Sequence, residues 1–167
     1  MDEALSRFVT GLAWTLIAFS ALATLILSLQ AAVLFTMFDA EVLQYVLDDL
    51  DPPPALPVDG ATLLRAMHAF VLAMLGVCVL TLVASIALLR RQAWSRMFWI
   101  VMFAFGAIVH VVGAIAPYLS ELPWQTNYDG VLKFASAVLA LILAVGYAWL
   151  ARKLMEPAVV AEFRRAR

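Results

Sequence analysis

Four long hydrophobic stretches, joined by short polar segments, dominate the chain. They cover about residues 8–38, 61–89, 93–115 and 131–151, and none of them contains Asp or Glu. An α-helix rises 1.5 Å per residue, so roughly 20 apolar residues cross the hydrocarbon layer of a membrane, which is about 30 Å thick. The pattern therefore predicts an all-α fold: an integral membrane up-down four-helix bundle that forms a single domain.

The first connection, residues 39–60, has an internal pattern of its own. Apolar residues at positions 42, 43, 46, 47 and 50 have the spacing of a short amphipathic helix. The prolines of residues 52–57 cannot continue this helix, because proline lacks the backbone donor and favours extended structure. We predict a short helix on the outer surface, an extended return, and a cap at Asp59 for the second span.

Prolines, glycines and charged residues mark the remaining helix ends. Residues 90–96 are too few for anything but a tight antiparallel hairpin. The third span is expected to stop at Pro117, and the fourth to begin after Asp129 and Gly130. Pro157 is expected to start a short helix in the C-terminal tail.

Basic residues gather on one side of the predicted bundle. The side with the termini and the second connection carries nine basic and four acidic residues, whereas the other side carries eight acidic and two basic residues. Lys and Arg are retained on the cytoplasmic side of membranes, where anionic lipid also attracts them. Both termini are therefore predicted to be cytoplasmic. The residues expected to fix this topology and to contact anionic lipid are Arg90, Arg91, Arg96, Arg152, Lys153, Arg164 and Arg165.

Composition supports the membrane class and weighs against others. Hydrophobic residues make up 65% of the 167 positions and the mean hydropathy is +0.96, whereas roughly half of a soluble domain is apolar. No basic stripe with interleaved aromatic residues indicates nucleic acid as a partner. Cys78 is the single cysteine, so an intramolecular disulfide is excluded. The lack of carboxylates in the spans weighs against proton-coupled transport.

Small residues recur along one face of several spans. Such stripes let helix backbones approach closely and form hydrogen bonds across the interface. The predicted packing positions are Ser20, Thr24 and Ser28 in the first span, Gly106 and Gly113 in the third, and Ser136, Ala140, Ala144 and Ala148 in the fourth.

His68 and His110 are the candidates for chemistry within the spans. Each lies six or seven residues from the outer end of its span, so antiparallel neighbours would bring both imidazoles into one layer. The glycines that share a face with His110 leave room for a neighbouring helix or for a b-type haem ligated by both histidines. Arg65, one turn from His68, is placed to meet a haem propionate or a lipid head group. Alternatively, both histidines are interface residues bonded to Ser or Thr. A metal site lacks carboxylate or thiolate ligands at this depth.

The C-terminal tail, residues 152–167, leaves two interpretations open. Val159, Val160 and Phe163 form a small apolar face beside Arg164 and Arg165. This arrangement is typical of a helix that rests on the anionic inner leaflet. The alternative is a frayed terminus whose charges only help to fix the topology.

Two segments resemble small four-span bacterial inner-membrane proteins. Residues 88–96 resemble their Leu-Leu-Arg-Arg-x-x-Trp-Ala-Arg turn, and residues 154–164 are similar to their Leu-x-x-Pro-x-Val-x-x-Glu-Phe-Arg ending. Gln92 and Ala93 replace the family's basic residue and Asn. Members are largely uncharacterised, so the resemblance implies a bacterial inner membrane but no activity.

The sequence favours a non-enzymatic accessory or interaction protein, whose partner is another membrane protein or a second copy of the chain. A b-type haem electron-transfer protein that uses His68 and His110 is the alternative. A small transporter is less favoured, because the inner half of the bundle offers only scattered hydroxyl groups among Leu, Ile, Val and Phe.

Overall fold

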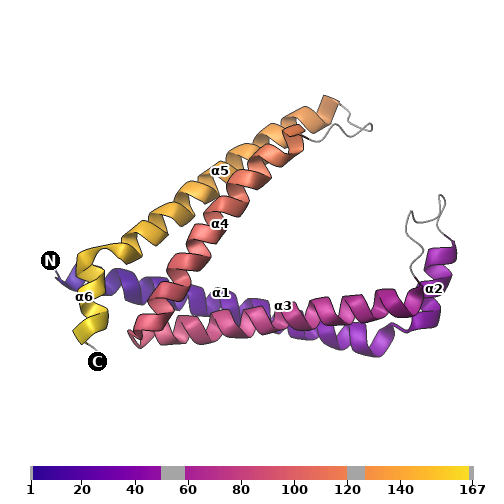
Figure 1. The fold of residues 1–167 in the computed structure, drawn as a ribbon, viewed down its shortest axis with the longest axis horizontal. Coiled ribbons are helices and arrows are strands. Elements are labelled where there is room, and N and C mark those ends of the chain that lie inside the picture. Colours follow the sequence, from indigo (N-terminus) through magenta and orange to yellow (C-terminus); the bar gives the residue numbers. More distant parts are fainter. Residues whose placement is uncertain (1, 50–58, 120–126, 166–167) are drawn as a thin grey trace. The chain divides into compact units, whose positions relative to one another are not determined.

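The computed structural model describes residues 2–49, 59–119 and 127–165, and all regular structure in these ranges is helical. The all-α prediction is confirmed for this part of the chain. The predicted extended return at residues 52–57 lies outside the described residues. The helices, shown in Figure 1, are α1 (Asp2–Met37), α2 (Ala40–Asp48), α3 (Gly60–Leu89), α4 (Ala93–Leu119), α5 (Asn127–Met155) and α6 (Pro157–Arg165).

Four of these helices are long and apolar enough to cross a membrane. The segments that qualify are Arg7–Met37, Gly60–Leu89, Ala93–Ala116 and Gly130–Met155, and they coincide closely with the four predicted spans. Even the shortest, with 24 residues, extends for about 36 Å, which exceeds the thickness of the hydrocarbon layer. The chain thus has the helices of a multi-pass membrane protein.

Two helix ends differ from the prediction. α4 continues through Pro117 to Leu119, and α5 begins at Asn127, three residues before Gly130. A proline in the last turn of a helix removes one backbone N–H donor. Few further hydrogen bonds depend on that turn, so the helix can continue through the proline. Glycine costs a helix only about 1 kcal/mol relative to alanine, which is too little to stop a helix that packs against a neighbour.

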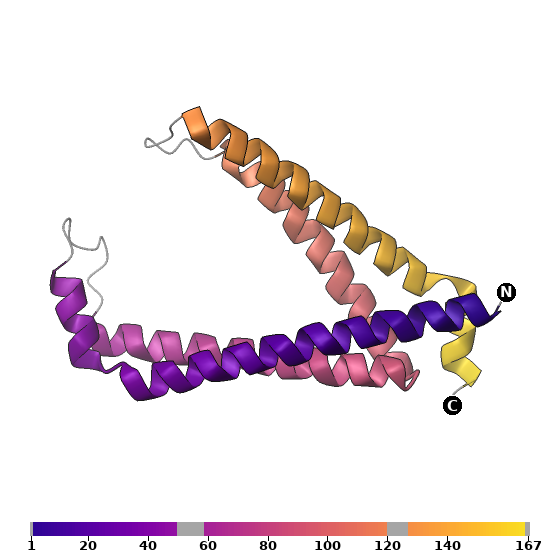
Figure 2. The ribbon, with the colours of Figure 1, turned by 180° about the vertical axis from the view of Figure 1, so that it is seen from behind.

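The chain divides into two compact units. Leu12–Ile86 forms the α1–α3 unit, and Met1–Gly11 together with Ala87–Arg167 forms the α4–α5 unit. Within the first unit, α1 and α3 run side by side and α2 turns away at their end (Figures 1 and 2). Within the second, α4 and α5 run side by side, and α6 follows α5 after a bend (Figures 1 and 2).

The predicted tight turn after α3 is a left-handed helix cap centred on Arg91. This residue has φ 57°. Its N–H donates to the Leu88 carbonyl at 3.0 Å, and the N–H of Gln92 donates to the Ala87 carbonyl at 2.9 Å. This pair of bonds defines the Schellman motif, in which glycine usually takes the left-handed position. An arginine there costs about 1 kcal/mol relative to glycine.

The C-terminal helix α6 packs two of its apolar residues inside the protein. Val159 is fully buried and Phe163 is only 2% exposed. The predicted start of the helix at Pro157 is confirmed. The expectation that this apolar face rests on lipid is wrong for these two residues, because the bend at Glu156 turns α6 so that they lie in the interior. The side chains of Arg164 and Arg165 lie outside the described residues.

The hydroxyl groups of the stripe in α1 form bonds within that helix. Thr24 donates to the Ser20 carbonyl at 2.7 Å, and Ser28 donates to the Thr24 carbonyl at 2.8 Å. Such bonds to the carbonyl four residues earlier are common for Ser and Thr inside helices. The hydroxyl protons of Thr24 and Ser28 are therefore used within α1, and hydrogen bonds between these two hydroxyls and another helix require a donor on that helix.

Candidate functional site

The ring of His110 is oriented by its own helix. The Nδ1 atom lies 2.7 Å from the carbonyl oxygen of Gly106. A carbonyl oxygen can only accept, so we assign the proton of the neutral imidazole to Nδ1. The Nε2 atom then carries the lone pair, and it can accept a hydrogen bond or ligate a metal ion.

Tyr147 of α5 approaches the same turn of α4. The ring centroids of His110 and Tyr147 are 5.2 Å apart. A Cβ atom at Gly106 would lie 3.4 Å from the Tyr147 ring, whereas one at Gly113 would meet no described atom within 4 Å. The Tyr147 ring thus packs against α4 at Gly106, where an added methyl group would be in ordinary van der Waals contact with it. No sequence pattern singles out Tyr147, because only packing brings it to His110.

An aromatic column continues from Tyr147 along α4. The ring of Phe103 lies 6.0 Å from that of Tyr147, and the ring of Trp99 lies 5.3 Å from that of Phe103. Phe103 and Trp99 are both buried. The Trp99 indole N–H is buried and has no hydrogen-bond acceptor among the described residues. These rings fill the contact between the two helices over several turns.

His68 lies in the α1–α3 unit and stacks on Phe35 of α1. Their ring centroids are 4.2 Å apart and the ring planes differ by 21°. The Nε2 atom of His68 is buried and has no hydrogen-bond partner in the described part of the chain. Because His68 and His110 belong to different units, their predicted placement in one layer stays a prediction. In the described ranges, no group of three or more His, Cys, Asp and Glu residues is placed to hold a metal ion.

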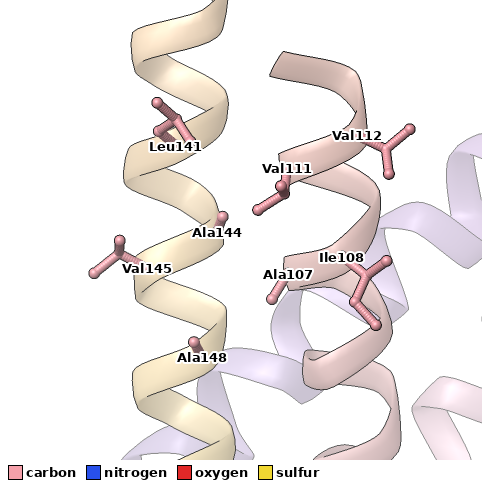
Figure 3. Close-up of a pocket in the computed structure, with 8 residues that line it drawn as sticks. All are labelled: Ala107, Ile108, Val111, Val112, Leu141, Ala144, Val145 and Ala148. Atoms are coloured by element: carbon pink, nitrogen blue, oxygen red, sulfur yellow. The ribbon is translucent and has the colours of Figure 1, made fainter. Parts of the chain in front are cut away.

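An apolar groove of about 390 Å³ runs along the contact between α4 and α5 (Figure 3). Ala107 of α4 faces the groove from one side, and Ala144 and Ala148 of α5 face it from the other (Figure 3). Of the other predicted packing positions in α5, Ala140 is half-buried and Ser136 is exposed. The remaining lining residues are Ile108, Val111, Val112, Leu141 and Val145.

A second open groove of about 400 Å³ lies in the α1–α3 unit. Gln30 is its one polar lining residue, and its other lining residues are Leu29, Val33, Leu34, Phe38, Met67 and Val71. The groove lies on the same two helices as the stacked pair of Phe35 and His68.

The short helix α2 is joined to the start of α3 by a hydrogen bond to the Gln44 side chain and by a close approach of the two backbones. The Gly60 N–H donates to Oε1 of Gln44 at 2.8 Å, and Nε2 of Gln44 donates to the Asp48 carboxylate at 2.8 Å. A Cβ atom at Gly60 would collide with the Ala40 carbonyl oxygen and lie 2.7 Å from the backbone nitrogen of Gln44. Glycine is therefore required for this close approach, a role that the sequence alone did not reveal.

Asp59 caps α3, as predicted. The Leu63 N–H donates to the Asp59 carbonyl at 3.0 Å. The hydrogen bond from the Thr62 side chain is the main cause that lowers the pKa of the Asp59 carboxyl below its ordinary value, and backbone hydrogen bonds from Asp59 and Thr62 and the charge of Arg65 add smaller effects. Arg65 thus favours the charged form of the capping carboxylate.

Arg91 links three segments of the α4–α5 unit. Its Nη2 atom donates to Oγ1 of Thr10 at 3.1 Å and lies 3.5 Å from Oε2 of Glu162 in α6. These contacts join the first helix, the turn before α4 and the C-terminal helix. The partners Thr10 and Glu162 are far from Arg91 in sequence, so no local pattern points to them.

Arg96, one turn into α4, contacts the bend between α5 and α6. Its Nη1 atom donates to the Leu154 carbonyl at 3.4 Å, and its guanidinium carbon lies 6.0 Å from the centre of the Phe163 ring. Its Nε atom is buried and has no acceptor among the described residues. Arg90 and Arg152 are exposed. The predicted basic residues therefore have different environments.

Comparison with known proteins gives no match: no family model, no curated protein and no solved structure is similar to this chain.

Proposed function

We propose that this chain is a non-enzymatic multi-pass protein of a bacterial inner membrane that associates with another transmembrane helix, from a partner protein or a second copy. The membrane class is supported by four helices of sufficient length and apolar composition. The bacterial inner membrane is proposed from the family that the turn at residues 88–96 and the ending at residues 154–164 resemble.

The apolar groove between α4 and α5 is the observation that carries this proposal. In lipid, helices associate through close van der Waals contact, and small residues allow the backbones to approach. Ala107, Ala144 and Ala148 provide such small side chains in the groove (Figure 3). All eight of its lining residues are apolar, so the groove suits an apolar helix better than a polar substrate.

Site-specific photo-crosslinking tests the proposal in intact membranes. A photoreactive amino acid at Val112 or Val145, both in the groove, should give a product heavier than the monomer. The same group at Leu139, an exposed residue of α5 outside the groove, is the control. Filling the groove with Ala144→Leu should reduce the yield severalfold. Products of monomer mass only, or equal yields at Leu139, would contradict the proposal.

We also propose that both termini are cytoplasmic, as the distribution of nine basic and four acidic residues on that side indicates. A reporter that is active only in the periplasm should be silent when fused after Arg167. The same reporter should be active when inserted between Pro54 and Ala55. The opposite pattern would reverse the proposed orientation.

A b-type haem protein is the second candidate, and the orientation of His110 favours it. The bond from Nδ1 to the Gly106 carbonyl leaves Nε2 as the ligating nitrogen, the usual arrangement of a histidine that binds a metal. His68 offers a buried Nε2 without a protein partner in the described residues. A bound haem would supply one-electron transfer. A Soret band that both His68→Ala and His110→Ala abolish would support this candidate. Haem-free protein from haem-supplemented cells would refute it.

A further inference from the structure

The charge of Arg96 has no acidic partner among the described side chains. Two acids of the α4–α5 unit have described side chains, and both are paired with other bases. Glu156 lies 2.9 Å from Nζ of Lys153, and Glu162 lies 3.5 Å from Nη2 of Arg91. Among the described residues, the guanidinium of Arg96 contacts the Leu154 carbonyl, 3.4 Å from Nη1, and the Phe163 ring.

These neighbours are neutral, so they do not neutralise the charge of the Arg96 guanidinium. A guanidinium has five donors and binds best to a carboxylate or phosphate that accepts two bonds at once. Arg96 is half-buried, its Nε atom has no acceptor in the described chain, and its hydrogen bond to the Leu154 carbonyl is long at 3.4 Å. Taking such a charge out of water without a counter-ion is costly. The site is therefore suited to an external anion.

The position of Arg96 in α4 identifies the chemistry of that anion. Arg96 is the fourth residue of a helix that begins at Ala93, so it lies about 5 Å from the start of the span. In a membrane this is the level of the phospholipid head groups. Arg90 and Arg152, at the same end of the helix pair and both exposed, add positive potential that attracts anionic lipid.

We propose that Arg96 binds the phosphate of an anionic phospholipid at the end of the α4–α5 pair where α6 folds back. The proposal rests on the membrane insertion proposed above. The sequence alone predicts lipid contacts for all seven basic residues, whereas in the structure these residues differ in their partners. Arg91 is occupied by Thr10 and Glu162, and Lys153 by Glu156. Arg96 is the partly enclosed cation that a phosphate would neutralise.

Lipid retention and thermal stability test the site on the full chain in detergent. Phosphatidylglycerol should raise the Tm of the wild-type protein more than phosphatidylcholine does, and native mass spectrometry should show it bound. Arg96→Gln should reduce phosphatidylglycerol retention about tenfold, because a charge-assisted hydrogen bond is lost. Arg152→Gln removes the same charge from an exposed position and should retain the lipid. Arg96→Lys, which keeps the charge but not the paired donors, should lie between.

Three results would overturn the proposal. The first is an equal loss of phosphatidylglycerol retention in Arg96→Gln and Arg152→Gln. The second is an equal increase in Tm with phosphatidylglycerol and phosphatidylcholine. The third is an increase in Tm with inorganic phosphate that equals the increase with phosphatidylglycerol at the same concentration. The last would indicate a soluble phosphate ligand. If Arg96→Gln does not fold, Arg96→Lys tests the site instead. Retention of phosphatidylglycerol by Arg96→Lys at the wild-type level would then contradict the proposal. Carbonate extraction of the wild type tests membrane insertion separately, so a failure there is distinguishable from a failure of the lipid site.

Discussion

The Nη2 atom of Arg91 lies 3.5 Å from Oε2 of Glu162, and this ion pair joins the turn before α4 to the C-terminal helix. The two side chains are 17% and 22% exposed, so solvent screens the pair less than it screens most surface pairs. The contact helps to hold α6 in the position that buries Val159 and Phe163. It makes the C-terminal helix a part of the folded unit.

A double-mutant cycle with Arg91→Gln and Glu162→Gln should give a coupling free energy of about 1 kcal/mol, the upper value for partly screened pairs. The measurement is the free energy of unfolding in mixed detergent and denaturant. Lys153 and Glu156, three residues apart and more exposed, provide the control pair, which should couple more weakly. Equal coupling free energies in both cycles would show that the Arg91–Glu162 pair stabilises α6 no more than an exposed surface pair does.

The backbone of Arg91 can be separated from its side chain. Arg91→Ala removes the contacts with Thr10 and Glu162 but keeps a Cβ atom at φ 57°. Arg91→Gly removes the same contacts and relieves the left-handed backbone. The free energy of unfolding should therefore be about 1 kcal/mol higher for Arg91→Gly than for Arg91→Ala. A glycine variant no more stable than the alanine variant would argue against a left-handed residue here.

Gly60→Ala should detach α2 from the start of α3. The new methyl group would collide with the backbone of Ala40 and Gln44, which cannot rotate aside. Overpacking of this kind costs about 1–3 kcal/mol. Hydrogen exchange of the amides in α2 should accelerate. Gly76→Ala in the same helix has open space around the new atom, so it should leave α2 unchanged. Matching exchange rates in the two variants would rule out the close contact at Gly60.

Acid should weaken the cap of α3. The pKa of Asp59 is lowered, first by the hydrogen bond from the Thr62 side chain. The stability that its carboxylate contributes is present above the ordinary aspartate pKa and is lost as the pH falls through the lowered value. Asp59→Asn keeps a capping side chain but cannot titrate, so its stability should change less over that acidic range. Unfolding measured against pH checks this. Parallel curves for the two proteins would mean that Asp59 does not contribute.

The tautomer of His110 is open to direct measurement. Solid-state ¹⁵N NMR of the labelled protein in lipid should show a protonated Nδ1 and an unprotonated Nε2, because Nδ1 donates to the Gly106 carbonyl. The opposite assignment would remove the bond to Gly106 and with it the lone pair on Nε2. It would also weaken the case for His110 as a haem ligand.

The elements of this fold are predictable from sequence because helices are local structures. Runs of apolar residues mark the four long helices, Asp59 caps α3 and Pro157 starts α6. The spacing of apolar residues also predicts α2. The predicted helix ends at Pro117 and Gly130 are wrong. A single residue that disfavours a helix costs less free energy than the hydrogen bonds and packing of the continuing helix contribute.

Sequence by itself determined that this chain is helical and long enough in four places to cross a membrane, because hydropathy and helix length need only neighbouring residues. Tertiary structure decided which side chains meet across different helices and turns. It placed Arg91 against Thr10 and Glu162, Gly60 against α2, and Tyr147 beside His110. These contacts join residues far apart in the chain, and they depend on which helices meet and on the rotation of each. No periodic pattern encodes either quantity.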